Sequence, residues 1–186
     1  MSLMCPLCLI AAALALDNMR VRTPAAAAAG SWIGAAVCAV YAILLFLLSS
    51  EEKAYKKAAA FFIAAAVIFA LALILPSETV LTKALLPAAG SILLIFGRHF
   101  ECTGHSAVIS DPDFKTYGFW LRLGSWYTIA LAASALGSLL SPMEGKIPSL
   151  IVSAGVLLTT VACFAGFVML LHSARLCRNF YGTLGR

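Results

Sequence analysis

The 186-residue chain is 62% hydrophobic and 11% charged, and its mean hydropathy is +0.98. This apolar surface exceeds what a soluble core of that length buries, so the composition excludes a water-soluble globular domain. It also excludes a disordered chain and a disulfide-stabilised secreted miniprotein, because both need a more polar sequence. Long uncharged apolar runs between short charged patches are typical of membrane-spanning helices. We therefore predict an all-α, polytopic helical membrane bundle that forms a single integral membrane domain over residues 1–186.

Six apolar runs are candidate transmembrane helices, in chain order residues 2–16, 24–48, 58–75, 80–96, 119–140 and 148–171. The first run has about 15 residues, which is short for a hydrocarbon core about 30 Å thick. We expect six spans, or five if this segment does not cross. We retain it in the mature chain, because Arg20 and Arg22 follow the apolar stretch, whereas a signal peptide has its positive charges before it. The fourth run contains Pro87, which removes a helix hydrogen bond and predicts a kink.

Positive charges are distributed unevenly over the predicted connections. Nine of the thirteen Lys and Arg residues fall on one side of the bundle and four on the other. The positive-inside rule places the nine-charge side in the cytoplasm, with loops 49–57 and 97–118 and the basic C-terminal tail 172–186. Arg20 and Arg22 favour the opposite orientation locally. We expect a protein of a bacterial cytoplasmic (inner) membrane, and the net charge of +5 is then a topology signal, not a nucleic-acid-binding signal.

Small residues recur at four-residue spacing in three of the predicted spans. In lipid, such residues let helix backbones approach closely and supply contacts that apolar burial does not drive. The small residues on which this prediction rests are Gly30, Gly34, Ala133, Gly137 and Gly155. They predict helix-packing seams, within the chain as the first interpretation and between subunits of a homo-oligomer as the alternative.

The predicted spans carry no ionisable side chain near their middle. Such a residue would be the default indication of a transport path or a proton relay. We therefore expect neither an ion-coupled pump nor a carrier of strongly charged solutes, whereas a path for neutral solutes stays open.

The longest predicted connection, residues 97–118, holds most of the polar chemistry of the chain. Its charged side chains predict a site that docks a partner protein: Arg98, Glu101, Asp111, Asp113 and Lys115. In the same segment, His99, Cys102 and His105 recur every three residues and offer imidazole and thiol ligands that suit zinc or a redox metal. Their spacing matches no standard zinc signature, and a fourth ligand is not obvious. Docking is the favoured interpretation, ahead of a merely solvated loop and of a metal site.

The start of the fifth predicted span carries three large aromatic residues: Trp120, Trp126 and Tyr127. An interfacial aromatic belt explains them, and a stacking site for a quinone or another planar ligand is the alternative. His99 and His172 follow two different spans on the same predicted side, which allows a haem between them. Cys5 and Cys8 have the CxxC spacing of redox pairs, but their apolar surroundings predict packing cysteines. We expect no cofactor as the first interpretation, with a quinone, a haem or a metal ion as alternatives.

Together these features predict a non-catalytic membrane subunit that anchors or docks a partner, with a quinone-interacting anchor of a redox complex as its specific form. Its expected partners are the lipid bilayer and either another protein subunit or a second copy of the chain, without nucleic acid. One alternative is a membrane transport component for a small neutral solute. The other is a membrane enzyme or metal protein that acts through the segment from His99 to His105.

Overall fold

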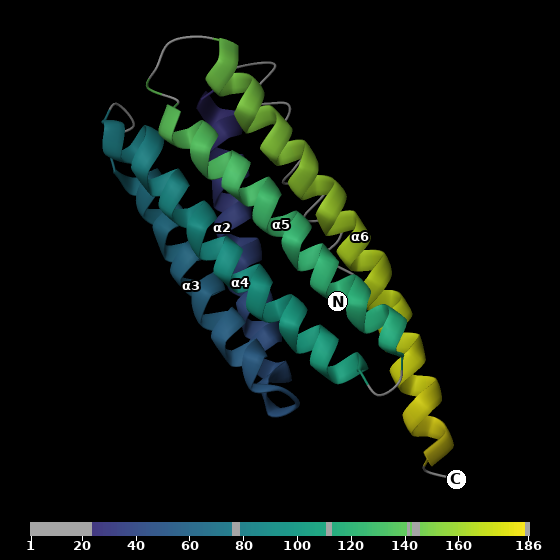
Figure 1. Ribbon diagram of the computed structural model, residues 1–186. Coiled ribbons are helices and arrows are strands. Elements are labelled where there is room, and N and C mark those ends of the chain that lie inside the picture. Colours follow the sequence, from purple (N-terminus) through teal and green to yellow (C-terminus); the bar gives the residue numbers. More distant parts are fainter. Residues whose placement is uncertain (1–23, 76–78, 111–112, 141, 143–145, 185–186) are drawn as a thin grey trace.

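The computed structural model is an elongated bundle of helices (Figure 1). It describes residues 24–75, 79–110, 113–140, 142 and 146–184. The long helices are α2 (Pro24–Leu47), α3 (Lys53–Ile74), α4 (Leu86–Ile109), α5 (Phe114–Leu140) and α6 (Lys146–Leu184). Two short segments adjoin them, the 3-10 turn η1 (Leu48–Ser50) and the π-helical turn η2 (Leu81–Leu85). The described residues are 95% helical and contain no strand, which confirms the all-α prediction.

The helices run up and down the bundle, and each packs chiefly against its neighbours in the sequence. Short connections such as residues 110–113, between α4 and α5, favour antiparallel neighbours. α4 therefore lies between α3 and α5, with α2 behind them in Figure 1. The C-terminal ends of α2, α4 and α6 consequently meet the N-terminal ends of α3 and α5 at one end of the bundle.

Local sequence fixes where several helices begin. Glu52 precedes α3 in an extended conformation (φ −147°, ψ 130°), and its carboxylate accepts a hydrogen bond from the backbone N–H of Ala54 at 3.3 Å. Asp113 caps α5 in the same way. Both caps satisfy N–H groups that have no partner inside the helix. The π-helical turn η2 ends two residues before Pro87 and accommodates its missing N–H, so that the chain continues into α4.

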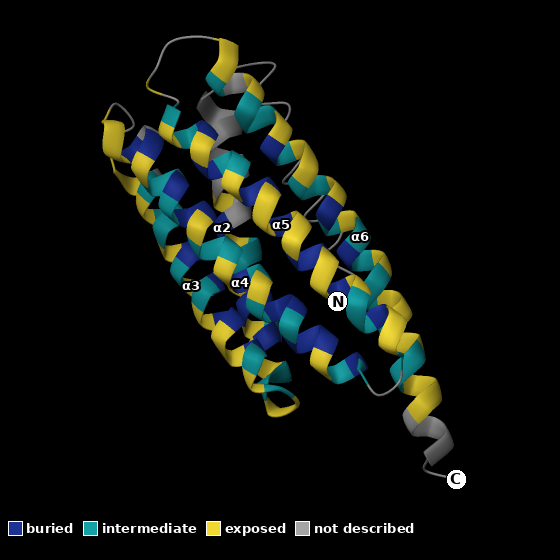
Figure 2. Ribbon diagram, viewed as in Figure 1, coloured by how far each residue is buried: buried dark blue, intermediate teal, exposed yellow. Residues whose placement is uncertain are grey.

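Several helices have the composition of membrane spans. Within the described residues, three are long and apolar enough to cross a membrane, namely Lys53–Ala72, Phe114–Leu140 and Lys146–Phe180. Large apolar side chains such as Leu47 and Trp126 are exposed, and exposed positions run along the outside of the bundle, especially on α6 (Figure 2). Such a surface is expected where lipid is the solvent. These features support a membrane protein in general, although six spans are not shown.

The predicted apolar runs correspond unevenly to the helices. Runs 24–48, 58–75, 119–140 and 148–171 coincide largely with α2, α3, α5 and α6. Run 80–96 covers η2 and the first half of α4, a helix that is not among the three described spans because its second half carries polar and charged side chains. The predicted first span, residues 2–16, lies outside the described residues, as do Cys5 and Cys8.

The prediction of a long loop over residues 97–118 was wrong. α4 continues without interruption to Ile109 and α5 begins at Phe114. Hydropathy ends a span where charges appear, but a helix can continue past them when its polar side chains face other helices. Gly97, Glu101, His105 and Ile109 are all buried and are spaced four residues apart, so they share one face of α4.

Small residues bring α5 and α6 together. A Cβ atom at Gly155 would lie 2.8 Å from the backbone N of Ser134 on α5, and one at Gly137 would lie 2.9 Å from a backbone N of α6. Any larger residue at either position would require the helices to shift, so these two positions lie in a packing contact within the chain. The remaining predicted packing residues are one half-buried position on α5 and two positions whose surroundings lie outside the description: Ala133, Gly30 and Gly34, respectively.

Gly155→Ala tests this contact. The added methyl group would push the two helix backbones apart, and we expect the free energy of unfolding to fall by about 1–3 kcal/mol, as for overpacking elsewhere. Unfolding in detergent, followed by tryptophan fluorescence, measures the change. Gly118→Ala is the matched control, because a Cβ there meets nothing within 4 Å and should leave stability unchanged or slightly raised. Equal stability of Gly155→Ala and the wild type would contradict the proposed contact.

Candidate functional site

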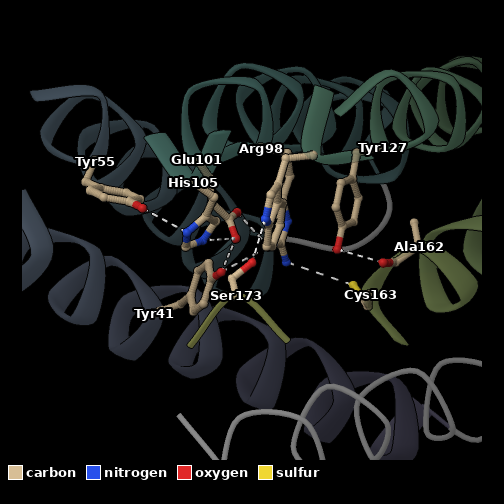
Figure 3. A network of polar contacts seen from close by, with 10 residues as sticks. Tyr41, Tyr55, Arg98, Glu101, His105, Tyr127, Ala162, Cys163 and Ser173 are labelled. Carbon is tan, nitrogen blue, oxygen red and sulfur yellow. Dashed lines mark hydrogen bonds and ion pairs between the residues drawn. The ribbon is translucent and has the colours of Figure 1, made fainter. Parts of the chain in front are cut away.

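The second half of α4 carries a buried polar cluster. Arg98, Glu101 and His105 are separated by three and four residues, so a helix places them on one face. That face lies inside the bundle, where the side chains of Glu101 and His105 are 3% and 9% exposed and that of Arg98 is 17% exposed. Figure 3 shows the cluster among residues from the neighbouring helices.

An ion pair forms the centre of the cluster. Arg98 Nη1 lies 2.7 Å from Glu101 Oε2, and the hydroxyl of Tyr41 on α2 donates a hydrogen bond to Glu101 Oε1. Arg98 also donates to the Tyr41 hydroxyl at 3.4 Å and to the sulfur of Cys163 on α6 at 3.9 Å. Both carboxylate oxygens are thus satisfied, which a charge removed from water requires.

Three aromatic rings surround the Arg98 guanidinium. Its central carbon lies 5.0 Å from the ring centroid of Tyr41, 5.1 Å from that of Phe62 and 4.7 Å from that of Tyr127. These rings come from α2, α3 and α5, and they attract the cation through their electron-rich faces. The Tyr127 hydroxyl donates to the backbone oxygen of Ala162 on α6 at 3.0 Å, which fixes its ring beside Arg98. Five helices therefore meet at one guanidinium, because α6 contacts it through Cys163 and also holds the Tyr127 ring in place.

His105 extends the cluster toward the end of the bundle. Its Nδ1 lies 2.8 Å from the hydroxyl of Tyr55 on α3. The centroid of its ring lies 4.4 Å from the ring centroid of Trp120 on α5. Trp120 Nε1 in turn donates to Ser173 Oγ on α6 at 3.0 Å. A Cβ atom at Gly104 would lie 2.8 Å from the ring of Tyr55, so only glycine lets this tyrosine reach His105. The cluster thus joins α2, α3, α4, α5 and α6.

The structure does not assemble the predicted metal site. Cys102 and His105 are buried, whereas His99 is exposed on another part of α4 beside Phe100. Across the described residues, no group of three His, Cys, Asp or Glu side chains could hold a metal ion. Residues three apart on an α-helix differ in direction by about 60°, so His99, Cys102 and His105 spread around α4. Two of them face the bundle interior and His99 faces outward. His172, the second predicted haem ligand, is exposed on α6, like His99 on α4.

The predicted docking residues fall into two groups. Arg98 and Glu101 are inside the bundle and cannot contact a soluble partner, so their assignment to a docking loop was wrong. Lys115 is exposed, and Asp113 caps α5 by accepting from the backbone N–H groups of Lys115 at 3.3 Å and Thr116 at 3.1 Å. Asp111 lies outside the described residues.

The three aromatic residues predicted to stack a ligand do not share one site. Trp120 and Tyr127 are buried and hydrogen-bonded to α6, whereas Trp126 is 59% exposed on the outside of α5. Residues that are close in sequence point in different directions around a helix, so their clustering in the sequence does not place them in one site.

The sequence analysis also missed Tyr41, Tyr55 and Phe62. The four-residue spacing from Gly97 to Ile109 was the available signal of a buried face on α4.

Arg98→Met tests the ion pair. The substitution leaves the Glu101 carboxylate buried without its cation. We therefore expect the free energy of unfolding in detergent to fall by about 3–5 kcal/mol. The double variant Arg98→Met/Glu101→Leu removes both charges and should recover most of the loss. Arg122→Met, on an exposed position of α5, controls for the loss of positive charge. If Arg98→Met were as stable as Arg122→Met, the pair would not be buried as described.

The Asp113 cap makes the start of α5 sensitive to acid. The Thr116 hydroxyl is the main cause that lowers the pKa of this carboxyl below its usual value of 3.8, with the backbone N–H groups of Thr116 and Lys115 adding to it. Because the pKa of Asp113 is lower in the folded state than in the unfolded state, the charged cap stabilises α5 fully at pH values above the unfolded-state pKa. This stabilisation is lost as the pH falls through the folded-state pKa.

We expect hydrogen-exchange protection at Lys115 and Thr116 to fall in the wild type between about pH 5 and about pH 2, after correction for the intrinsic exchange rate. Asp113→Asn cannot lose a charge, so its protection should stay constant over this range. Identical profiles for the two proteins would show that the cap does not titrate.

Comparisons with known proteins leave the site to be interpreted from its own chemistry. No family model, no curated protein and no solved structure matches this chain. The chain is therefore characterised by its geometry, a helical bundle with membrane-type helices and a buried cluster of Arg98, Glu101 and His105 at the meeting point of five helices.

Proposed function

We propose that the protein is a membrane transport component whose solute-binding site is built on Arg98 and Glu101. The observation that supports this proposal is the ion pair that these residues form inside the bundle, where the Glu101 side chain is 3% exposed. Ionisable side chains within membrane domains are expensive to place and commonly mark substrate or ion pathways. The pair therefore supplies an ionisable site inside the bundle, whereas the sequence analysis found no such site in the middle of its predicted spans.

Stability alone is a weak reason for such a pair. Replacing a buried ion pair by apolar residues of similar volume is often neutral or stabilising. The stability of the bundle therefore does not account for the two charges at its centre, whereas an action on a solute does. The three rings and the Tyr41 hydroxyl around the pair also hold it in a defined geometry, which is what recognition of a solute requires.

The solute that fits this chemistry is small and polar and carries a carboxylate. A guanidinium binds a carboxylate through two parallel hydrogen bonds, and Arg98 offers this geometry once it leaves Glu101. An amino acid also carries an ammonium group, which the Glu101 carboxylate and the surrounding rings would attract. Binding would exchange one ion pair for two, so no buried charge would be left without a partner. This solute class replaces the neutral solute expected from the sequence.

The anchor function remains as a second candidate because of α6. This helix has 39 residues and is about 58 Å long, which exceeds the thickness of a bilayer with its headgroups. Its C-terminal end extends past the connection between α4 and α5 (Figure 1). Arg175 and Arg178 are exposed there, near the exposed Lys115 at the start of α5. This basic end, and not the interior of α4, is where we would expect a partner subunit to dock.

Uptake by proteoliposomes that contain the purified full chain tests the transport proposal. We expect the wild type to take up ¹⁴C-labelled alanine, which carries both complementary charges, faster than protein-free liposomes. The folded double variant Arg98→Met/Glu101→Leu should lose this uptake, whereas Arg122→Met should retain it. Wild-type uptake no faster than that of empty liposomes, or uptake unaffected by the double variant, would contradict the proposal. Capture of a stoichiometric subunit, lost on substitution of Arg175 and Arg178, would favour the anchor function.

A further inference from the structure

One buried nitrogen of the cluster lacks a hydrogen bond. His105 Nε2 has no hydrogen-bond partner among the described residues, although the ring is buried and its other nitrogen contacts Tyr55. The nearest acidic atom, Glu101 Oε1, is 3.8 Å away, which is too long for a hydrogen bond. Buried polar atoms without a partner are rare in native structures, and each calls for an explanation. Here the lone atom faces the Glu101 carboxylate, which indicates a hydrogen ion as the missing ligand.

We propose that His105 and Glu101 form a proton-binding site, and that the proton bound there exchanges with Arg98 as the partner of Glu101. A proton needs no cavity, so the buried Nε2 atom of His105 can take it up where it lies. Histidine is also the side chain that ordinarily changes charge between about pH 5 and pH 8. As a coupling step for transport, the proposal rests on the function proposed above, but the proton site itself stands on the geometry of His105.

The protonation step is balanced by a proton from the aqueous phase. The proposal assigns the neutral ring the tautomer in which Nδ1–H donates to the Tyr55 oxygen, so the Nε2 lone pair is free to accept that proton. In the resulting imidazolium both nitrogens carry N–H groups, and Nε2–H faces Glu101 Oε1. A shift of about 1 Å closes this contact into a charge-assisted hydrogen bond. The imidazolium at Oε1 then offsets the charge of Glu101 and repels the guanidinium at Oε2, so the Arg98–Glu101 pair weakens and Arg98 is released toward the solute.

The surroundings of His105 contain few competing charges. The ionisable side chains around the pair come from all five helices: Tyr41 on α2, Tyr55 on α3, Arg98 and Cys102 on α4, Tyr127 on α5, and Cys163 and Cys177 on α6. Tyrosine and cysteine are ordinarily uncharged at neutral pH. Among the described residues, the charges closest to His105 in the cluster are therefore Glu101, which favours the imidazolium, and Arg98, which opposes it. Protonation and release of Arg98 favour one another for this reason.

A proton can reach this site from the nearby end of the bundle. Tyr55, which contacts His105, lies three residues after the Glu52 cap at the start of α3, a distance of about 4.5 Å along the helix. His105 itself lies four residues before the end of α4. Arg98 lies almost two turns deeper. The cluster thus runs from a proton-accessible end to a deeper ion pair, which is the order that coupling requires.

Nuclear magnetic resonance of the full chain in lipid nanodiscs tests the proposal directly. The chain has three histidines, and replacing the exposed pair by His99→Asn and His172→Asn leaves His105 as the one ¹⁵N-histidine signal. Between about pH 8 and about pH 5 we expect its ring nitrogens to move to their imidazolium shifts. The ¹⁵N side-chain signal of Arg98 should change with the same midpoint, while that of the exposed Arg122 should not. Equal thermal stability of this variant and the wild type confirms that it folds.

The outcomes separate this inference from the transport proposal. A neutral His105 throughout this range, or titration without a change at Arg98, would overturn the proton-exchange site even if alanine uptake were observed. Joint titration of His105 and Arg98 without alanine uptake would support the site and contradict transport. If both hold, an inward proton gradient should accelerate alanine uptake by the wild type. The variant His105→Gln, which cannot bind the proton, should take up alanine at the same rate with and without the gradient.

Discussion

The ion pair of Arg98 and Glu101 constrains how the whole bundle is arranged. Two charges removed from water need partners on every side, and a single helix cannot provide them. α2 supplies the Tyr41 hydroxyl, α3 the ring of Phe62, and α5 the ring of Tyr127, which α6 holds through a backbone oxygen. The central position of α4 follows from this requirement. The α5–α6 contact through glycine brings α6 close enough to take part.

The bundle therefore has a polar interior section and an apolar exterior, as expected when lipid is the solvent. Two aromatic side chains of α3 reach the interior where α4 has glycine. Gly97 lies against the ring of Phe62 and Gly104 against that of Tyr55, at distances where a Cβ atom would be crowded. Small residues on α4 thus determine how closely the cation and the imidazole are enclosed. The same close packing explains why a proton is the ligand best suited to the His105 end of the cluster.

The sequence predicts the fold class better than it predicts the site. Composition and the long apolar runs are enough for an all-helical membrane-type bundle, and most helices fall where those runs lie. The site depends on the direction in which side chains point. Ending a predicted span at the first charged residue assigns the second half of α4 to a loop. Within that predicted loop, Arg98 and Glu101 were interpreted as docking residues and His105 as a metal ligand. The four-residue spacing of Gly97, Glu101, His105 and Ile109 carries the correct information. Tyr41 and Tyr55 have no comparable local signal, because tertiary contacts alone bring them to α4.

Hydrogen exchange along residues 97–109 in lipid nanodiscs tests most directly whether this polar segment is a helix inside the bundle. A buried helix keeps its backbone N–H groups bonded and protected, whereas a solvated loop exchanges them rapidly. The account predicts slow exchange from Gly97 to Ile109, comparable with that of the buried part of α5, and faster exchange in the connection that follows. Rapid exchange over Arg98 to His105 would contradict it, because the ion pair and the proton site would then have no enclosed setting.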